Sequence, residues 1–258
     1  MELISPAGYA KRAVWAVQEY TLLSAQAIVN VFRQPRYVAD TIQQADLIGV
    51  GSLPIVAMAG GFTGLVLALN YSPTLERFGV LTLTGQVVSL SMVRELGPVI
   101  TSLMMAGRNA TGMASEIGSM KVTEQIDAMR ALGTDPTKKL VTPRVVATVV
   151  MLFFLTIISD LVGLFGGYIY SAAVLHLDSY QYWTSAYQTL TYNDVITGLI
   201  KPIFFGFIIA TVGCYYGIST TGGTQGVGRS TTQAMVTSSV LILAVDAVLA
   251  QLLLLLRP

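Results

Sequence analysis

Five charged side chains stand inside long apolar runs of this sequence: Arg94, Glu95, Asp160, Lys201 and Asp246. A charge at the centre of a membrane costs about 2.5–3.5 kcal/mol by insertion scales, so we expect each of these residues to face protein or water. Arg94 and Glu95 are adjacent, so they point in different directions and cannot pair well with each other. Two interpretations stay open, structural pairing between helices and a polar wall for a headgroup or an ion.

The depths of three of these charges predict one ion pair. At 1.5 Å per helical residue, Lys201 lies about 9 Å and Asp246 about 15 Å from the same, outer side of the membrane. Opposite charges at matched depth on neighbouring helices reduce each other's cost of burial. We therefore expect Lys201 to pair with Asp246, with Asp160, at a similar depth, as the competing acid.

The residues needed for catalysis or metal binding are scarce. The chain has one histidine, His176, and one cysteine, Cys214, which excludes an intrachain disulfide, a CxxC metal site and a histidine-based centre. Residues 223–230, GTQGVGRS, match a phosphate-binding loop except that Arg229 replaces its lysine. A membrane span precedes them where a strand is required, so we predict a flexible cytoplasmic loop. We expect no catalytic residue, metal or cofactor, and a motor on another protein.

Composition indicates the class of protein that holds these charges. Of the 258 residues, 53% are hydrophobic and 11% are charged, against about 25% charged in soluble domains. The formal net charge is +1, which gives no sign of a nucleic-acid partner. We predict an all-α, polytopic membrane protein whose residues 1–258 form a single domain.

Apolar runs predict five membrane spans, and glycines in the first run allow close helix contact. Residues 8–34 alternate polar and apolar faces at helical spacing and suit the plane of the membrane interface. Gly60, Gly61 and Gly64 place small residues on a face of the first span. A polar break follows that span at residues 72–79, and residues 176–194 are rich in interfacial aromatic side chains. The predicted spans are residues 47–70, 80–107, 145–175, 195–218 and 232–256.

A short polar helix is expected at about residues 120–133, with its core at 124–132. Thr123 is the expected N-cap, and Glu124 and Asp127 favour the positive end of the helix dipole. Gly133 suits the position after the helix. The segment carries a small apolar stripe formed by Ile126, Met129 and Leu132. It is either an ordinary surface helix on the membrane or a docking helix for a groove in a cytoplasmic partner.

Basic residues set the expected orientation. The connection 107–144 is rich in them and the connection 176–194 has none, so the first is cytoplasmic by the positive-inside rule. Five spans then place the N-terminus in the cytoplasm and the C-terminus outside. The basic residues of the first connection are Arg108, Lys121, Arg130, Lys138, Lys139 and Arg144.

The segment 94–144 carries a series of motifs in a fixed order: RELGP, AGR, G-x-x-SEIG, TEQI-x-A and DP…PR. This pattern resembles the MlaE/YrbE family of permeases, with Ser115 where the family has alanine, and the likeness extends over nearly the whole chain. The resemblance implies a homodimeric permease of an ABC transporter in the inner membrane. Its implied partners are cytoplasmic ATPase subunits, an external ring of MCE-domain protein and often a STAS-domain protein. The implied substrate is phospholipid or a related lipid, moved between the inner membrane and the outer envelope.

The resemblance also assigns residues. It makes 124–132 the helix that couples to the ATPase, and it places Arg94, Glu95, Lys201 and Asp246 along the polar lipid path. Apolar positions near the lipid pocket are Leu67, Leu75, Phe78 and Leu96. Two other functions stay open from the sequence, namely an ion-coupled transporter that uses Asp160 or Asp246, and a membrane scaffold. The lack of an inverted repeat argues against the first.

Overall fold

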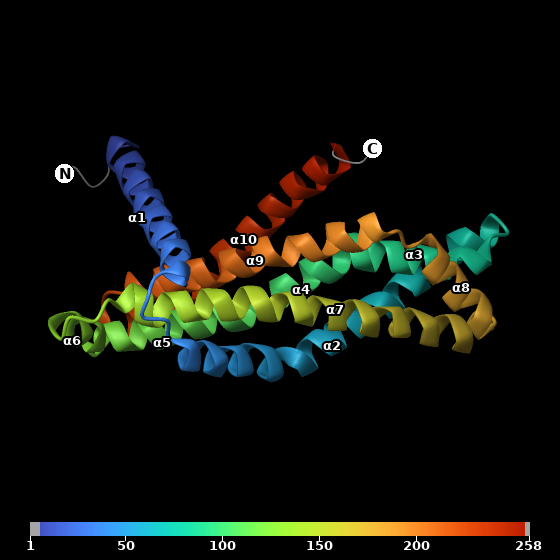
Figure 1. Ribbon diagram of the computed structural model, residues 1–258. Coiled ribbons are helices and arrows are strands. Elements are labelled where there is room, and N and C mark those ends of the chain that lie inside the picture. Colours follow the sequence, from blue (N-terminus) through green and yellow to red (C-terminus); the bar gives the residue numbers. More distant parts are fainter. Residues whose placement is uncertain (1–5, 256–258) are drawn as a thin grey trace.

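A computed structural model describes residues 6–255, and all of the regular structure in that range is helical (Figure 1). The α-helices are α1 (Pro6–Phe32), α2 (Val38–Arg77), α3 (Thr84–Ser91), α4 (Gly97–Met105), α5 (Thr111–Val122), α6 (Gln125–Ala131), α7 (Thr142–Ala173), α8 (Ser179–Thr189), α9 (Tyr192–Ile218) and α10 (Gly223–Leu255). A 3₁₀ turn, η2 (Leu81–Leu83), and three π-helical turns, η3 (Met92–Leu96), η4 (Ala106–Ala110) and η5 (Thr137–Val141), join some of them.

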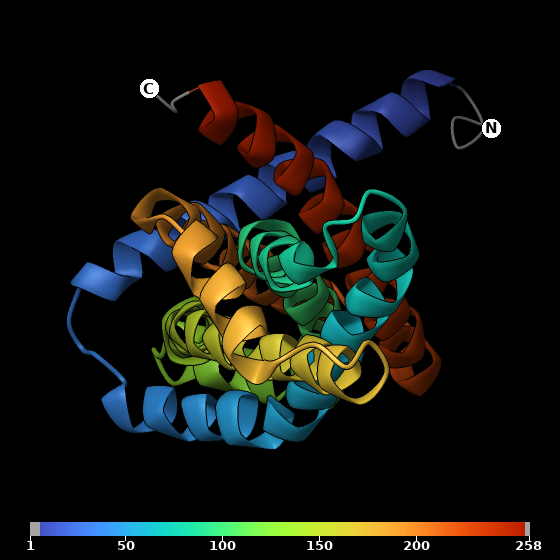
Figure 2. The ribbon, with the colours of Figure 1, turned by 90° about the vertical axis from the view of Figure 1, so that its right-hand side faces the viewer.

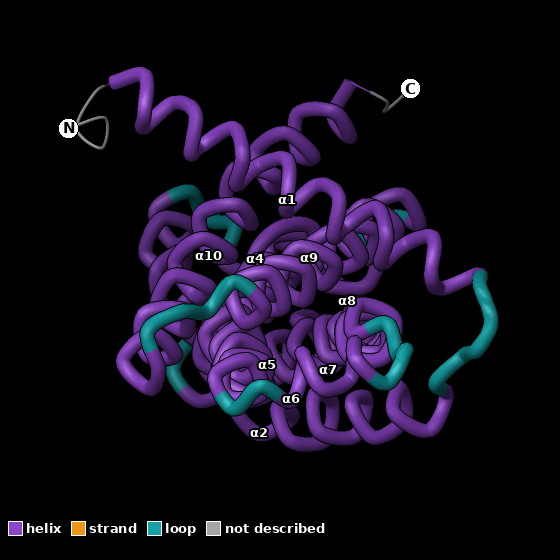
Figure 3. The backbone as a smooth tube through the Cα atoms, turned by 90° about the vertical axis from the view of Figure 1, so that its left-hand side faces the viewer, coloured by secondary structure: helices purple, strands orange, loops and turns teal. Residues whose placement is uncertain are grey.

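Five helical stretches are long and apolar enough to cross a membrane, which confirms a polytopic all-α membrane protein. They are Val38–Arg77, Leu81–Val122, Thr137–Ala173, Tyr192–Ile218 and Gly223–Leu253. The second stretch has 42 residues and would be about 63 Å long at 1.5 Å per residue. It therefore extends well beyond the roughly 30 Å of membrane hydrocarbon, and its far end carries α6 at one end of the bundle (Figures 1 and 3).

α1 crosses the bundle at a steep angle to the long axis (Figure 1). Its Tyr20 hydroxyl lies 2.9 Å from the Thr211 hydroxyl of α9, and the Tyr20 ring meets Tyr215 edge to face at 5.9 Å. Because the spans run along the long axis, α1 lies across them rather than parallel to them. Part of α1 and the last turns of α10 leave the bundle on the same side (Figure 2).

α2 and α7 approach closely because glycines face backbone. A β-carbon on Gly64 would overlap the carbonyl of Gly163, and one on Gly60 would lie 2.6 Å from Ser159 Oγ. In return, a β-carbon on Gly166 would overlap the carbonyl of Gly61. The small-residue face predicted on the first span is therefore the surface on which α7 packs.

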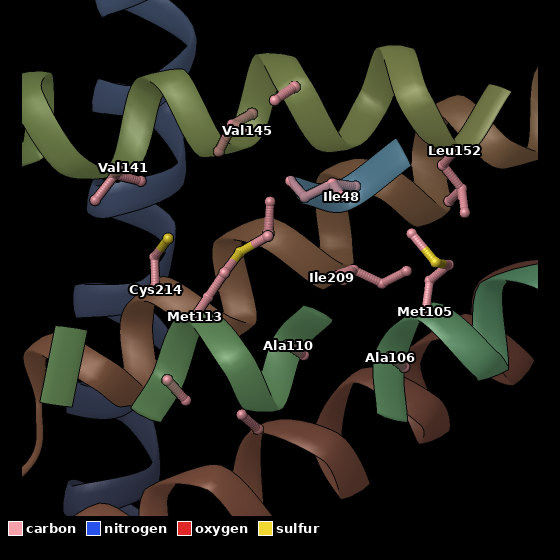
Figure 4. Close-up of a cluster of buried hydrophobic side chains, with 14 of the residues drawn as sticks. Ile48, Met105, Ala106, Ala110, Met113, Val141, Val145, Leu152, Ile209 and Cys214 are labelled. Carbon is pink, nitrogen blue, oxygen red and sulfur yellow. The ribbon is translucent and has the colours of Figure 1, made fainter. Parts of the chain in front are cut away.

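The main hydrophobic core lies where α4, η4 and α5 pack against α7 and α9 (Figure 4). Met105 and Met113 fill the space between these helices, and Ile48 of α2 reaches the same cluster. Ile209 and Cys214 contribute from α9, and both are fully buried. The cysteine therefore acts as a small apolar side chain in the core.

The polar break predicted at residues 72–79 is mostly helical. α2 continues to Arg77 although Pro73 lies inside it. Proline cannot donate to the carbonyl four residues back, and the Ser72 hydroxyl donates to that carbonyl, of Leu69, at 3.1 Å. The chain turns only at Gly79, whose φ is +70°.

The loop predicted at residues 223–230 is also wrong, because α10 begins at Gly223. Gly222 and Gly223 have φ values of +88° and +68° and make the turn before the helix. The Thr220 hydroxyl donates to Ser230 at 2.8 Å and fixes the first turns of α10 against the end of α9. The element before this segment is a helix, which removes the strand that a phosphate-binding loop needs.

The other predicted spans differ from the observed helices mainly at their ends. The second stretch begins at Leu81 and continues to Val122, beyond the predicted end at residue 107. The third begins at Thr137, before the predicted residue 145, and ends at Ala173, and the fourth begins at Tyr192. Residue 256 of the fifth prediction lies outside the described residues. Hydropathy follows apolar side chains, whereas a helix continues as long as its backbone hydrogen bonds do.

Candidate functional site

Lys201 lies at the centre of a charged cluster inside the bundle. Its side chain is fully buried, and its Nζ donates to Glu95 Oε2. The same Nζ lies 2.9 Å from Asp246 Oδ1, outside hydrogen-bonding geometry, so this second contact is electrostatic. We call Lys201, Glu95 and Asp246 the charge triad. The predicted pairing with Asp246 is confirmed, and Glu95 is a further partner that the sequence did not reveal.

Local backbone features bring the members of the triad together. Glu95 lies on the π-helical turn η3, directly before Gly97 and Pro98. Pro98 has no N–H to donate and its ring repels the carbonyl four residues back, which favours a wider turn there. On α9, Gly198 contacts the carbonyl of Val93, because a β-carbon there would overlap it. This close approach sets Lys201, one turn later, beside η3.

Glu95 is the exposed member of the triad. Its side chain is 46% exposed in the single chain, compared with 19% for Asp246. A carboxylate that neutralises a buried lysine and still faces outward can contact a molecule beside the bundle. The triad contains one cation and two acids, so its formal charge is negative.

Arg94 makes a separate ion pair. Its Nε donates to Asp194 Oδ1 at 2.8 Å, and its Nη2 lies 2.7 Å from the same oxygen. The other carboxylate oxygen of Asp194 accepts the backbone N–H of Thr191 at 3.0 Å and its hydroxyl at 2.8 Å. Asp194 thus fixes Arg94 and the start of α9. The sequence reasoning missed Asp194, although Thr191-x-x-Asp194 before an apolar run matches a capping box.

Asp160 of α7 does not belong to the charge triad. Its side chain is buried against Gly97, where a β-carbon would overlap its Oδ1. That oxygen has no hydrogen-bond partner. The predicted competition with Asp246 for Lys201 is therefore not observed.

The four predicted apolar positions lie in two places. Leu67 and Leu96 pack against a small cluster that includes Val88 and Met92. Phe78 is 76% exposed at the end of α2, and Leu75 precedes it by one turn. In the single chain, only Leu67 and Leu96 therefore pack against a common cluster.

The predicted docking segment forms a helical hairpin at one end of the bundle. α5 ends at Val122, and Glu124 has a φ of +61° before α6 begins. The prediction that Thr123 caps the N-terminus of this helix is wrong, because its hydroxyl donates to the backbone carbonyl of Ser119 at 2.9 Å. The expected end is confirmed, because Gly133 has a φ of +77° and its N–H bonds the carbonyl of Arg130.

The stripe on α6 is divided between the core and the surface. Ile126 is fully buried and Met129 packs against the same core, whereas Leu132 is 84% exposed. An interpretation in which Ile126 contacts a partner is therefore wrong. A partner would meet Glu124, Asp127 and Leu132, which are all exposed.

One ion pair joins α6 to α5, and a second ion pair lies within α6. Lys121 Nζ lies 2.9 Å from Asp127 Oδ2, and Arg130 Nη1 lies 3.3 Å from Asp127 Oδ1. The hydrogen bond from Lys121 lowers the pKa of Asp127 below its ordinary value, with the charge of Arg130 adding to this. The exposed face of α6 is therefore charged around one apolar side chain, Leu132.

Comparison with known proteins decides the family. The model of the family described as Permease MlaE matches residues 41–252. The chain belongs to the MlaE permease family. It is 43% identical over 241 residues to a probable ABC transporter permease protein of Rickettsia bellii, covering 93% of each chain. It is also 32% identical over 209 residues to the intermembrane phospholipid transport system permease protein MlaE of Haemophilus influenzae, covering 81% of this chain and 80% of that one.

A plant relative matches over most of this chain as well. The chain is 35% identical over 246 residues to the chloroplastic protein TRIGALACTOSYLDIACYLGLYCEROL 1 of Arabidopsis thaliana, covering 95% of this chain and 69% of that protein. The charge triad, the Arg94–Asp194 pair and the hairpin at α6 are thus features of a permease-family membrane subunit.

Proposed function

We propose that this protein is the permease of an ABC transporter that moves phospholipid between the inner membrane and the outer envelope. The observation that carries the proposal is the charge triad, in which the fully buried Lys201 is neutralised by two acids and one of them, Glu95, remains half exposed. A phospholipid headgroup is charged, and a polar wall inside an apolar bundle offers it a place that lipid tails cannot. The permease relative in Haemophilus influenzae carries a phospholipid transport name, which supports the same substrate class.

A second copy of the chain completes the path in this proposal. α10 presents a long apolar surface, because only 11% of its most apolar window is buried in the single chain. Soluble proteins rarely leave such faces open, and in a membrane either lipid or another helix covers them. We infer a homodimer whose lipid path lies beside Glu95, with Leu67 and Leu96 on its apolar wall and Leu75 and Phe78 near its outer mouth.

Energy comes from a separate ATPase in this proposal. The hairpin of α5 and α6 is part of the basic connection 107–144 and extends past the crossing point of α1, which supports its lying outside the membrane on the cytoplasmic side. α6, with Glu124, Asp127 and Leu132 exposed, is the proposed coupling helix. An MCE-domain protein would receive or deliver lipid at the opposite, α8 end, and a STAS-domain protein would accompany the ATPase. The N-terminus would be cytoplasmic and the C-terminus external.

The test combines purification with lipid transfer. The protein is purified from its native membrane, its companions are identified, and the complex is placed in liposomes that contain a fluorescent phospholipid. We expect an ATPase and an MCE-domain protein to co-purify, and lipid transfer to require ATP. Glu95→Gln should slow transfer at least several-fold, whereas Glu19→Gln, the same change at an exposed position of α1 away from the proposed path, should not.

Two outcomes would contradict the proposal. Uptake that follows an ion gradient without an ATPase would favour the ion-coupled transporter. A complex that assembles but transfers no lipid under any nucleotide condition would favour the scaffold.

A further inference from the structure

A groove lies where α1 meets the starts of α2 and α7. It is formed by residues other than those of the charge triad. Its volume is about 350 Å³. Its walls are apolar, and they include Val31 and Phe32 of α1, Val38 of α2 and Val146 of α7. Two cations, Arg36 and Lys138, also line it. No residue of the charge triad or of the Arg94–Asp194 pair takes part.

The rim of this groove is strongly basic. The segments 33–40 and 137–143 contain the cations Arg33, Arg36, Lys138 and Lys139 and a single acid, Asp40. Lys139 uses that acid, because its Nζ is ion-paired with Asp40, and it also lies 4.4 Å from the centre of the Tyr37 ring. Within these two segments, positive charge therefore exceeds negative charge around the groove.

Arg36 is the clearest sign that a partner of opposite charge belongs here. Its side chain is exposed, and among the side chains that the structure describes it has no ion-pair or hydrogen-bond partner. Lys138 donates to the backbone carbonyl of Gln34, which holds the segment between α1 and α2 against η5 but leaves the lysine charge without an acid.

The place of the groove in the fold selects the ligand. α1 crosses the bundle at a steep angle to the spans, which suits an amphipathic helix in the plane of the membrane surface, and the groove lies at its end, where the chain turns into the first span. At that level, acyl chains meet charged headgroups. Apolar walls below a basic rim match a molecule with an apolar chain and an anionic head. A free phosphate ion would leave the apolar walls unused.

We propose that this groove binds an anionic phospholipid of the surrounding membrane, with its phosphate at Arg36 and Lys138 and an acyl chain along Val38 and Val146. The bound lipid fills the space between α1 and the bundle and holds α1 in its crossing position. The site differs from the proposed transport path in place and in residues, so it retains its lipid whether or not the protein transports lipid.

The experiment measures lipid retention by native mass spectrometry. The full chain in detergent is titrated with phosphatidylglycerol and, in parallel, with phosphatidylcholine that has the same acyl chains. We expect retention of phosphatidylglycerol over phosphatidylcholine. Arg36→Gln should weaken phosphatidylglycerol retention about fivefold, the effect of one basic side chain near an anionic lipid surface. The matched control is Arg229→Gln, an exposed arginine on α10 outside the groove.

Two further arms locate the lipid and separate it from the transport path. Phosphatidylglycerol with a photoreactive acyl chain should label peptides that contain residues 31–41 or 142–146, and Glu95→Gln should leave this labelling unchanged. Added inorganic phosphate should not displace the lipid. Equal retention of both lipids, an equal effect of Arg229→Gln, labelling only elsewhere, or displacement by phosphate would each overturn the inference. Loss of transport with intact labelling would count against the proposed function alone.

Discussion

Arg94 and Asp194 are joined through one carboxylate oxygen, at 2.8 Å from Nε and 2.7 Å from Nη2. Asp194 is only 1% exposed, whereas Arg94 is one-third exposed. Because the second oxygen of Asp194 holds Thr191 at the start of α9, this contact links the π-helical turn η3 to the first turn of α9. The same two elements carry Glu95 and Lys201, so the ion pair fixes the frame in which the charge triad forms.

The first prediction concerns this ion pair. Asp194→Asn keeps an oxygen for Thr191 but removes the charge that Arg94 needs. A hydrogen bond to a charged group contributes about 1.5–3 kcal/mol, so we expect a loss of stability of that order. Arg94→Gln should cost less, because its side chain is partly solvated. Thermal unfolding in detergent measures both.

The double variant is the control for the first prediction. If the pair acts as a unit, Arg94→Gln combined with Asp194→Asn should cost less than the sum of the single changes. Strict additivity would show that the contact contributes nothing of its own, and that Asp194 acts through Thr191 alone.

The second prediction concerns the charge triad. Because Lys201 has two acids, either Glu95→Gln or Asp246→Asn leaves it with one counter-charge, and each should lower the melting temperature only slightly. The double change leaves a fully buried lysine alone, which costs about 3–5 kcal/mol. We therefore expect a loss larger than the sum of the two single changes, measured by thermal unfolding.

A triple variant checks the cause of that loss. Adding Lys201→Met to the double variant removes the unpaired charge and should recover most of the stability, since neutral replacements of buried ion pairs are well tolerated. A triple variant that is no more stable than the double would assign the loss to packing rather than to charge.

The third prediction tests the close approach of α2 and α7. Gly64→Ala places a methyl group against the carbonyl of Gly163, where rigid backbone rather than a flexible side chain must move. Overpacking of this kind costs about 1–3 kcal/mol, so the melting temperature should fall. Gly112→Ala is the matched control, because no atom lies within 4 Å of the new methyl group. A control as damaging as Gly64→Ala would contradict the packing argument.

The sequence predicted the broad fold and part of the site, each for an identifiable reason. Apolar runs require membrane spans, so the five spans followed directly. Matched depth on neighbouring helices predicted the contact of Lys201 with Asp246, because depth can be counted along a helix. The contact of Lys201 with Glu95 could not be predicted by counting residues along a regular helix. Glu95 lies on the π-helical turn η3, which changes the direction in which its side chain points.

Other features required information that periodicity does not carry. The spacing of Ile126, Met129 and Leu132 predicts an apolar stripe. It does not predict which of these side chains packs in the core and which stays exposed. The glycines of residues 223–230 indicate a loop, but among them only Gly223 has a positive φ, and α10 begins at that residue. Asp194 is the last residue of the predicted aromatic connection 176–194, although the capping motif Thr191-x-x-Asp194 indicates that the helix begins before it.

The last prediction concerns the exposed face of α6 and rests on the proposed coupling to an ATPase. Leu132 is 84% exposed and stands among charged side chains, so it is the apolar group that a partner groove can bury. Leu132→Ser should weaken co-purification of the ATPase and lower lipid-stimulated ATP hydrolysis. It should leave the melting temperature of the isolated permease unchanged, since the side chain makes few contacts within the chain.

Ile126→Ser is the contrasting variant, at the start of α6 and six positions before Leu132 in the sequence. Ile126 is fully buried in the main core, and shortening a buried isoleucine typically costs about 2–5 kcal/mol, so this change should lower the melting temperature before any partner is added. The two variants thus separate docking from folding. If Leu132→Ser leaves the ATPase bound with unchanged affinity, the partner does not dock on this face. If both variants destabilise the isolated permease equally, then α6 serves the fold rather than coupling.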